Sequence, residues 1–371
     1  MWRVRAKGED METTVKVNLK DNSYAIIIGS ALSRLGTELQ TLDIGRDAVV
    51  VTHPILKRLY GRALGKSLAA AGLSVRFFTV PEGETSKSAP VFFKLVEAIA
   101  RYSARRGIFI VAFGGGVIGD LTGYVAAAYK RGVPYVQVPT TLLAQIDSAI
   151  GGKVAIDLPV GKNLVGAFYQ PRLVFSDVTL LSTLDKRQIR NGLSEAVKYG
   201  VIADKKLFDY IAGHVAKLLI LDPDTLAHVV LSCSRIKARV VEQDEKETKG
   251  IRSILNFGHT VGHAVEAAGL FKRYHHGEAV ALGMRAASEL SVRLGLFAAQ
   301  DAARVGDVLS EIGLPERIDG IRLPDILKHM AHDKKFKDGQ TRFVLATGIG
   351  SVKIVDGIPL KTITQAIKAF I

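Results

Sequence analysis

The stretch from Arg252 to Glu278 carries four of the nine histidines of the chain. His259 and His263 are four residues apart, so on a helix they share one face with Cβ atoms about 6 Å apart. His275 and His276 follow in a second segment. Imidazoles from two segments, usually with a carboxylate, are a common way to bind a divalent transition metal. The stretch therefore predicts a metal site, although such pairs also occur on ordinary amphipathic helices.

Two further groups of polar residues could support this chemistry. Helical periodicity over 253–268 predicts one helix, which would place Arg252 and Asn256 on the same strip as His259. Glu195 and Lys198 are three residues apart in GLSEAVKYG, so they are neighbours on a helix. Taken alone, this second pair is most simply an ion pair on the surface.

A glycine-rich turn, FGGGVIGD, follows the most apolar run of the chain. Its glycines at 114, 116 and 119 fit G-x-G-x-x-G, which lets backbone N–H groups at a helix N-terminus approach a pyrophosphate. The match is weak, because the run is not the first strand and no acidic residue lies about 20 positions further on. A tight turn between a strand and a helix is the alternative.

Polar residues gather on both sides of this turn. Glu84 and Lys87 lie in a loop directly after a predicted strand, where parallel sheets bind ligands. Downstream, a glycine-rich segment indicates an anion site with a carboxylate to orient it; it contains Thr140, Thr141, Asp147, Lys153, Lys162 and Asn163. Near the C-terminus, HDKKFKDG offers His332, Lys334 and Lys335, which alone would be surface residues.

The elements that carry these residues change character along the chain. Up to about residue 178, short apolar runs alternate with helical segments, which predicts an α/β domain with a Rossmann-like parallel sheet over 1–178. Residues 1–12 look like a dispensable extension. Helical periodicity then dominates, with extended runs only near 341–345 and 352–355. We therefore expect a mainly α-helical C-terminal domain over 179–371.

Composition excludes several classes of protein. The chain has 371 residues, a net charge of +14 and one cysteine, Cys233, which excludes a disulfide framework. Its basic residues are scattered and not interleaved with aromatic ones, which argues against a nucleic-acid partner. No apolar run reaches 18 residues, so we expect no membrane partner. The basic N-terminus lacks the apolar region of a secretory signal, and a cytoplasmic location is expected.

Taken together, these segments closely resemble the 3-dehydroquinate synthase family, from about Thr13 to the end. The resemblance rests on six motifs in the family's order and spacing: GGGVIGDLTGYVAA, VPTTLLAQIDSAIGGKVAID, GKNLVGAFYQP, EAVKYG, LNFGHTVGHA and HGEAVALGM. It implies a phosphate-eliminating lyase of the shikimate pathway. Members convert 3-deoxy-D-arabino-heptulosonate 7-phosphate to 3-dehydroquinate and phosphate by transient oxidation with NAD, phosphate elimination, re-reduction, ring opening and aldol closure. The implied cofactors are NAD and one divalent metal, zinc or cobalt, in a homodimer.

The resemblance also implies roles for individual residues. Glu195, His259 and His276 match the metal ligands, so His263, a candidate ligand by spacing, instead matches a proton-transfer or supporting role. The other matches to catalytic or substrate-binding positions are Arg131, Asp147, Lys153, Lys162, Asn163, Lys198, Lys237, Glu247, Arg252, Asn256 and Lys335. The matches to cofactor-binding positions are Glu84, Lys87, Gly115, Gly116, Val117, Asp120, Thr140, Thr141, Asp147, Lys153, Lys162 and Thr183.

Two departures from the family and three alternatives complete the prediction. His53 stands where the family usually carries an Asp or Asn that contacts the nucleotide, and the loop after Glu247 is one residue longer. The alternatives are another sugar phosphate cyclase, a metal- and NAD-dependent polyol phosphate dehydrogenase, and a non-enzymatic basic binding protein. Asn256 with the nearby basic residues favours the dehydroquinate branch. The last alternative leaves Glu195, His259 and His276 unexplained.

Overall fold

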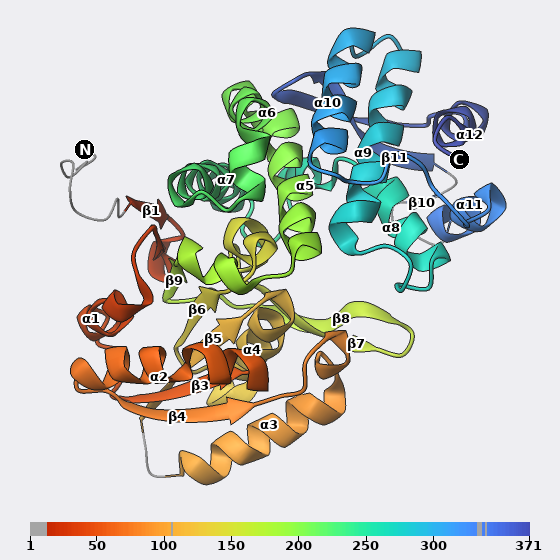
Figure 1. The fold of residues 1–371 in the computed structure, drawn as a ribbon. Helices are drawn as coiled ribbons and strands as arrows, with labels where there is room; N and C mark the ends of the chain where they lie inside the picture. Colours follow the sequence, from red (N-terminus) through yellow and green to blue (C-terminus); the bar gives the residue numbers. More distant parts are fainter. Residues whose placement is uncertain (1–12, 105–106, 332–335, 338–339) are drawn as a thin grey trace. The chain divides into compact units, whose positions relative to one another are not determined.

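The computed structural model describes residues 13–104, 107–331, 336–337 and 340–371 (Figure 1). The chain forms two compact units, Met1–Leu184 with Lys237–Lys246, and Asp185–Ile236 with Glu247–Ile371. Among the described residues, no helix is both long enough and apolar enough to cross a membrane. Cys233 is fully buried.

A seven-stranded sheet forms the centre of the first unit, in the order β1-β2-β9-β6-β5-β3-β4 (Figure 1). All neighbouring strands are parallel except β1 and β2. The parallel α/β sheet predicted from the alternation of strands and helices is therefore confirmed. Its strands are β1 Thr13–Val17, β2 Tyr24–Ile28, β3 Asp47–Thr52, β4 Ser74–Thr79, β5 Ile108–Gly114, β6 Tyr135–Pro139 and β9 Leu173–Ser176.

Helices cover both faces of this sheet because its strands are apolar on both sides. Val50 of β3 packs in one core with side chains of α1 Leu35–Thr41 and α2 Pro54–Ala70. Val51, which points the other way, packs with side chains of α3 Ala89–Tyr102 and α4 Gly116–Ala128. The chain therefore leaves β3 towards one face and the adjacent β5 towards the other. Such a switch point is where open α/β sheets bind ligands.

Several smaller elements of the first unit were not predicted, because their sequences show no helical or strand periodicity. The glycine-rich segment after β6 forms a π-helix, Ala144–Ser148, and an antiparallel hairpin of β7 Lys153–Leu158 and β8 Gly161–Phe168. Short 3₁₀ helices lie at Lys20–Asn22, Leu32–Arg34, Glu84–Ser86, Tyr129–Arg131 and Val178–Thr183, the last being η6.

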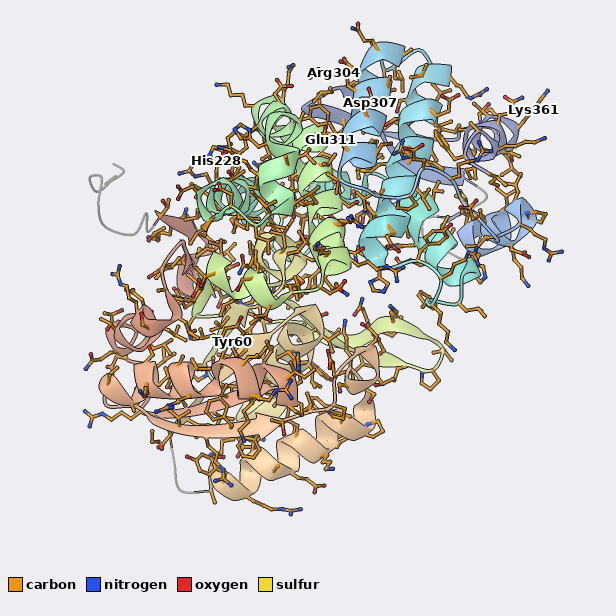
Figure 2. All side chains as sticks on the ribbon, in the orientation of Figure 1. Tyr60, His228, Arg304, Asp307, Glu311 and Lys361 are labelled. Atoms are coloured by element: carbon orange, nitrogen blue, oxygen red, sulfur yellow. The ribbon has the colours of Figure 1, made fainter. Side chains whose placement is uncertain are left out.

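The second unit is mainly helical, as predicted, and its helices pack around α9 His276–Arg293. α9 contacts α5 Lys186–Ala203, α8 His259–Ala268, α10 Ala299–Glu311, α12 Leu360–Lys368 and β11 Gln340–Gly348. Figure 2 shows Arg304, Asp307 and Glu311 along α10. The remaining elements are α6 Lys205–Leu219, α7 Pro223–Gln243, which ends in the first unit, α11 Leu323–Ala331, β10 Phe336–Lys337 and β12 Ser351–Asp356.

The helix predicted over 253–268 is broken, which is the main error of the sequence-based prediction. Ile251–Asn256 form a 3₁₀ helix, η7, and α8 begins only at His259. Gly258 between them has φ 77°, a left-handed conformation that glycine adopts at little cost. Arg252 and Asn256 therefore do not share a helical strip with His259.

Candidate active site

Three side chains from three helices of the second unit meet at one point. Glu195 lies in the middle of α5, His259 is the first residue of α8, and His276 is the first residue of α9. The Nε2 atoms of both imidazoles lie 3.5 Å from Oε1 of Glu195. One ligand atom from each residue lies within 4.8 Å of the others. The structure thus brings together the three residues that the resemblance matched to metal ligands.

Hydrogen bonds orient both imidazoles towards Glu195. Nδ1 of His259 donates to the carbonyl of Phe257 at 3.1 Å, and Nδ1 of His276 donates to Oε2 of Glu266 at 3.0 Å. When Nδ1 carries the proton, Nε2 presents a lone pair. Once Nε2 of His276 has lost its proton, two such lone pairs and a buried carboxylate oxygen face one another, an arrangement that a divalent cation stabilises. The donor set, two imidazoles and one carboxylate, fits zinc or cobalt.

The charges of the site influence one another strongly. Burial would raise the pKa of Glu195, but Lys198, His259 and His276 hold that pKa well below its ordinary value. Burial lowers the pKa of His259 well below its ordinary value, despite Glu195. Burial would also lower the pKa of His276, but Glu195 and Glu266 raise it to about 10. His276 therefore holds a proton in the metal-free protein, and a bound metal must displace it.

Lys198 and His263 complete this cluster in different ways. Lys198 forms an ion pair with Glu195, and both side chains are buried, with 1% and 0% of their surface exposed. The prediction of a surface ion pair was therefore wrong, because α5 is packed on all sides at this level. His263 is exposed, and its ring centroid lies 5.2 Å from that of His259 and 5.9 Å from that of His276.

Close packing of α8 against α9 sets the spacing of the two imidazoles. A Cβ at Gly283 of α9 would lie 1.9 Å from the carbonyl oxygen of Gly258, and one at Gly262 would lie 3.0 Å from that of Ala279. Only glycine fits at either contact without a shift of backbone. The first turns of both helices, with His259 and His276, are thereby held close together.

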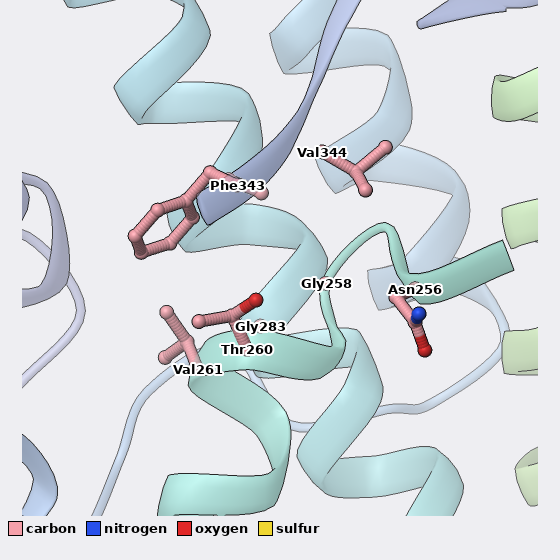
Figure 3. A pocket seen from close by; sticks show the side chains of 8 residues that line it. Asn256, Gly258, Thr260, Val261, Gly283, Phe343 and Val344 are labelled. Carbon is pink, nitrogen blue, oxygen red and sulfur yellow. The ribbon is translucent and has the colours of Figure 1, made fainter. Parts of the chain in front are cut away.

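The two predicted site residues before α8, Arg252 and Asn256, have different surroundings. Arg252 is buried on η7, whereas Asn256 lines a shallow pocket with Gly258, Thr260 and Phe343 (Figure 3). The pocket has no room for a water molecule. The hollow itself is therefore too small to hold a ligand.

The glycine-rich turn in the first unit forms a tight cradle at the switch point of the sheet. Gly115 precedes the first residue of α4. A Cβ there would lie 2.9 Å from Cγ2 of Thr141, and a Cβ at Gly116 would lie 3.0 Å from Oγ of Ser148. The N–H of Thr140 donates to the carbonyl of Gly114 at 3.0 Å. The bare helix N-terminus fits the pyrophosphate of a dinucleotide.

A second polar cluster lies at the same end of α4. Nζ of Lys87, a buried residue, donates to Oδ2 of Asp120 at 2.6 Å and to Oδ1 of Asn163. Lys162 lies 3.6 Å from Glu84. Burial raises the pKa of Asp120 to about 6, although Lys87 opposes the shift. The structure thus groups five of the predicted site residues, from the loop after β4, from α4 and from the β7–β8 hairpin.

Other predicted site residues of the first unit occupy different positions. Nζ of Lys237 forms an ion pair with Asp147 and also donates to its carbonyl at 2.7 Å. Lys153 begins β7 and is exposed. Oγ1 of Thr183 bonds to Oη of Tyr60, which Figure 2 labels, at 2.8 Å. Arg131 lies three residues beyond the far end of α4, and that end is about 18 Å from Gly116 along the helix axis.

Two predicted positions remain. Glu247 is exposed, has φ 57°, and begins the second segment of the second unit. Lys335 lies outside the described residues, as do His332 and Lys334. His53, the departure from the family pattern, precedes α2 at the end of β3, and burial lowers its pKa.

Glu266 belongs to this cluster, and sequence reasoning missed it. It follows His263 by three residues on α8, and its buried carboxylate accepts the hydrogen bond from His276. Helical spacing could have indicated it, because residues three apart share a face. The partner itself could not be predicted, since His276 comes from another helix.

Fold and site together define a class of protein, the dinucleotide- and metal-binding α/β enzymes with a helical second unit. Solved structures of this class are similar to the chain. The 2-epi-5-epi-valiolone synthase of Streptomyces hygroscopicus, with NAD⁺ and Zn²⁺ bound, is 29% identical, with a TM-score of 0.85, and covers 100% of this chain and 99% of its own. A 2-deoxy-scyllo-inosose synthase with NAD⁺ and Co²⁺ is 26% identical, with a TM-score of 0.88, over 97% of this chain and 100% of its own.

The family within this class follows from the sequence comparisons. The models of the 3-dehydroquinate synthase N-terminal and C-terminal regions match residues 77–191 and 192–336. A 3-dehydroquinate synthase of Desulforamulus reducens is 44% identical over 343 residues, 92% of this chain and 95% of that protein. One of Pelotomaculum thermopropionicum is 43% identical over 358 residues, 96% of each chain. The chain belongs to the 3-dehydroquinate synthase family.

Proposed function

We propose that this enzyme converts 3-deoxy-D-arabino-heptulosonate 7-phosphate to 3-dehydroquinate and phosphate. The observation that carries the proposal is its 44% identity over 92% of the chain to a relative of that name. The site agrees, because a buried two-histidine, one-glutamate cluster and a glycine cradle occur in one chain. The similar cyclases with other products share less sequence, 29% and 26%.

Glu195, His259 and His276 would hold the metal. A divalent ion in this position lowers the pKa of substrate hydroxyls and polarises a carbonyl. Glu266 and the carbonyl of Phe257 keep the two imidazoles in the tautomer that binds metal. His263 is exposed beside them, and we assign to it the exchange of a proton between substrate and solvent.

Residues 1–178 would form the NAD-binding domain, with Gly115, Gly116 and Val117 donating backbone N–H groups to the pyrophosphate. NAD supplies a two-electron oxidant that is regenerated within each turnover. We assign further cofactor contacts to Glu84, Lys87, Asp120, Thr140, Thr141, Asp147, Lys153, Lys162 and Thr183. The ion pair of Lys87 and Asp120 holds the loop after β4 against the N-terminal half of α4.

Residues 179–371 would form the metal- and substrate-binding domain. Basic residues suit a substrate that carries a carboxylate and a phosphate, because arginine and lysine form charge-assisted hydrogen bonds to both. We assign substrate contacts to Lys198, Lys237, Glu247, Arg252, Asn256 and Lys335 of this range, and to Arg131, Asp147, Lys153, Lys162 and Asn163 of residues 1–178. Asn163 is preorganised for this task, because Lys87 and Asp157 hold its side chain and backbone.

One assay tests the activity. With NAD⁺, zinc and the heptulosonate phosphate, we expect phosphate release without accumulation of NADH, and a chelator should abolish it. Phosphate is measured colorimetrically and NADH by its absorbance at the same time points. Net NADH would show a dehydrogenase. Turnover of sedoheptulose 7-phosphate in place of the heptulosonate would show a sister cyclase.

A substitution tests the glycine cradle. Gly115→Val should raise the Kd for NAD⁺ at least about 10-fold, because its side chain would crowd Thr141 and the path of the pyrophosphate. Calorimetric titration of NAD⁺ measures the effect. Gly65→Ala is the control, since a Cβ at Gly65 on α2 meets nothing within 4 Å. Equal affinity in both variants would contradict a pyrophosphate site at the turn.

We further propose a cytoplasmic homodimer without nucleic-acid or membrane partners. The single buried cysteine suits a reducing compartment. Some basic residues of the described part pair with carboxylates, as Arg322 does with Asp325 and Arg342 with Asp356. Light scattering coupled to gel filtration measures the oligomeric state.

A further inference from the structure

Side chains in the first two turns of α5 form hydrogen bonds and an ion pair with the first turn of α9. Nε and a terminal nitrogen of Arg187 donate to both carboxylate oxygens of Glu278, at 2.6 and 2.7 Å. Oδ1 of Asn191 accepts from the N–H of Glu278 at 3.1 Å. Nδ2 of Asn191 and Nε2 of Gln188 lie 3.2 and 3.3 Å from Nδ1 of His275. Side chains of α5 thus bind the backbone and side chains on both sides of His276.

Glu278 connects these contacts to the backbone at the start of α9. Its Oε2 accepts from the N–H of His275 at 2.8 Å, which forms a capping box. The same carboxylate binds the guanidinium of Arg187 in a bidentate pair, the geometry that restricts an ion pair most. Arg187 therefore orients the Glu278 carboxylate, and this carboxylate caps the N-terminus of α9.

The two helices also touch at their backbones here. A Cβ at Gly277 would lie 2.4 Å from the carbonyl oxygen of Asn191. Asn191 is buried, with 2% of its surface exposed. With backbone contact on one side and the bidentate pair on the other, the first turn of α9 has little room to shift or rotate relative to α5.

α5 also carries Glu195, one turn after Asn191. Any change in how α5 holds the start of α9 therefore changes the position of His276 relative to Glu195. We propose that Arg187, through Glu278, and Asn191 are positioning residues that set the metal affinity of the site. The proposal rests on the proposed role of Glu195 and His276 as metal ligands. It assigns a role to an arginine that touches none of the three ligand side chains.

Groups that orient metal ligands typically contribute 10–100-fold to metal affinity. We expect Arg187→Gln to raise the Kd for Zn²⁺ about 10-fold, measured by competition of the metal-free protein with a chromophoric chelator. The visible absorption spectrum of the Co²⁺-loaded protein should also change, because it reports ligand geometry. Arg187 is 44% exposed, so the variant should fold. Glu278→Gln keeps a capping oxygen but loses the ion pair, and should match Arg187→Gln.

Arg322→Gln is the control, because it removes an Arg–carboxylate pair of the same type at the start of α11, with distances of 2.9 and 3.2 Å. Its Kd and Co²⁺ spectrum should equal those of the unmodified protein. The double variant of Arg187 and Glu278 should be no weaker than either single variant. A Kd for Arg187→Gln within two-fold of the control, with an unchanged spectrum, overturns the proposal. Failure of the unmodified protein to bind one Zn²⁺ per chain would instead overturn the proposed metal site.

Discussion

His259→Ala and His276→Ala should each purify without bound metal, while His263→Ala keeps about one metal ion per chain. The first two substitutions remove an Nε2 that faces Glu195 at 3.5 Å. With two of three protein ligands left, a zinc site loses most of its affinity. We expect activity to fall at least about 1,000-fold in both variants, because the metal supplies several kcal/mol of transition-state stabilisation. Metal content is measured by atomic emission after dialysis.

His263 and His228 provide the comparison. His263 is exposed beside the site, so its loss should lower activity while the metal stays bound. His228 lies on α7, where its ring packs 4.0 Å from that of Tyr210 (Figure 2), and His228→Ala should keep both metal and activity. Full metal occupancy in His276→Ala would contradict the assignment of ligands. A metal-free His263→Ala would support the second possible trio, His263, Glu266 and His276.

The metal site shows how far the sequence alone could lead. Spacing identified the stretch that contains His259 and His276, because histidines gathered in one segment are informative. It favoured His263 as a ligand, because sequence spacing indicates which side chains are close only within one helix, as in an i, i+4 pair. The arrangement depends on the start of α9 lying beside the start of α8, a tertiary contact. Only the resemblance to a family indicated Glu195.

Burial was the property that the sequence predicted least well. Glu195 and Lys198 look like a surface pair because charged residues three apart on a helix usually are. They are buried because α5 packs against both α9 and α6. The break before α8 was missed for a related reason: the φ of 77° at Gly258 suits the contact of that glycine with Gly283, which no local pattern reveals.

The parallel sheet was predictable, since fully buried strands such as β5 read as continuous apolar runs. The β7–β8 hairpin was not. Its residues alternate poorly, because β8 packs few of its side chains and leaves Lys162, Asn163 and Leu164 exposed. Those exposed positions include two of the predicted anion-binding residues. The exposure of these β8 side chains explains why the sequence shows no strand periodicity here. The same exposure makes the side chains available to a ligand.

Lys198→Met should destabilise the metal-free protein strongly and the zinc-bound protein much less. Removing one partner of a buried ion pair leaves an uncompensated charge and costs about 3 kcal/mol or more. For a unit of this size, that is roughly 6–12 °C in Tm. Glu195, which is fully buried, would lose the cation that most lowers its pKa and would keep only protonated His276 as a charged partner. A bound divalent ion replaces the lost positive charge, so zinc should recover most of the difference.

Lys205→Met separates this effect from the general loss of a lysine. Lys205 pairs with Asp209 four residues on along α6, but the two side chains are 57% and 41% exposed. Exposed pairs of this kind contribute about 0.3–0.5 kcal/mol, so its Tm should change by roughly 1–2 °C with or without zinc. Thermal unfolding of both variants with excess chelator and with excess zinc gives four values. If zinc leaves the Tm deficit of Lys198→Met unchanged, then lysine and metal do not stabilise the same carboxylate, and Glu195 is not a ligand.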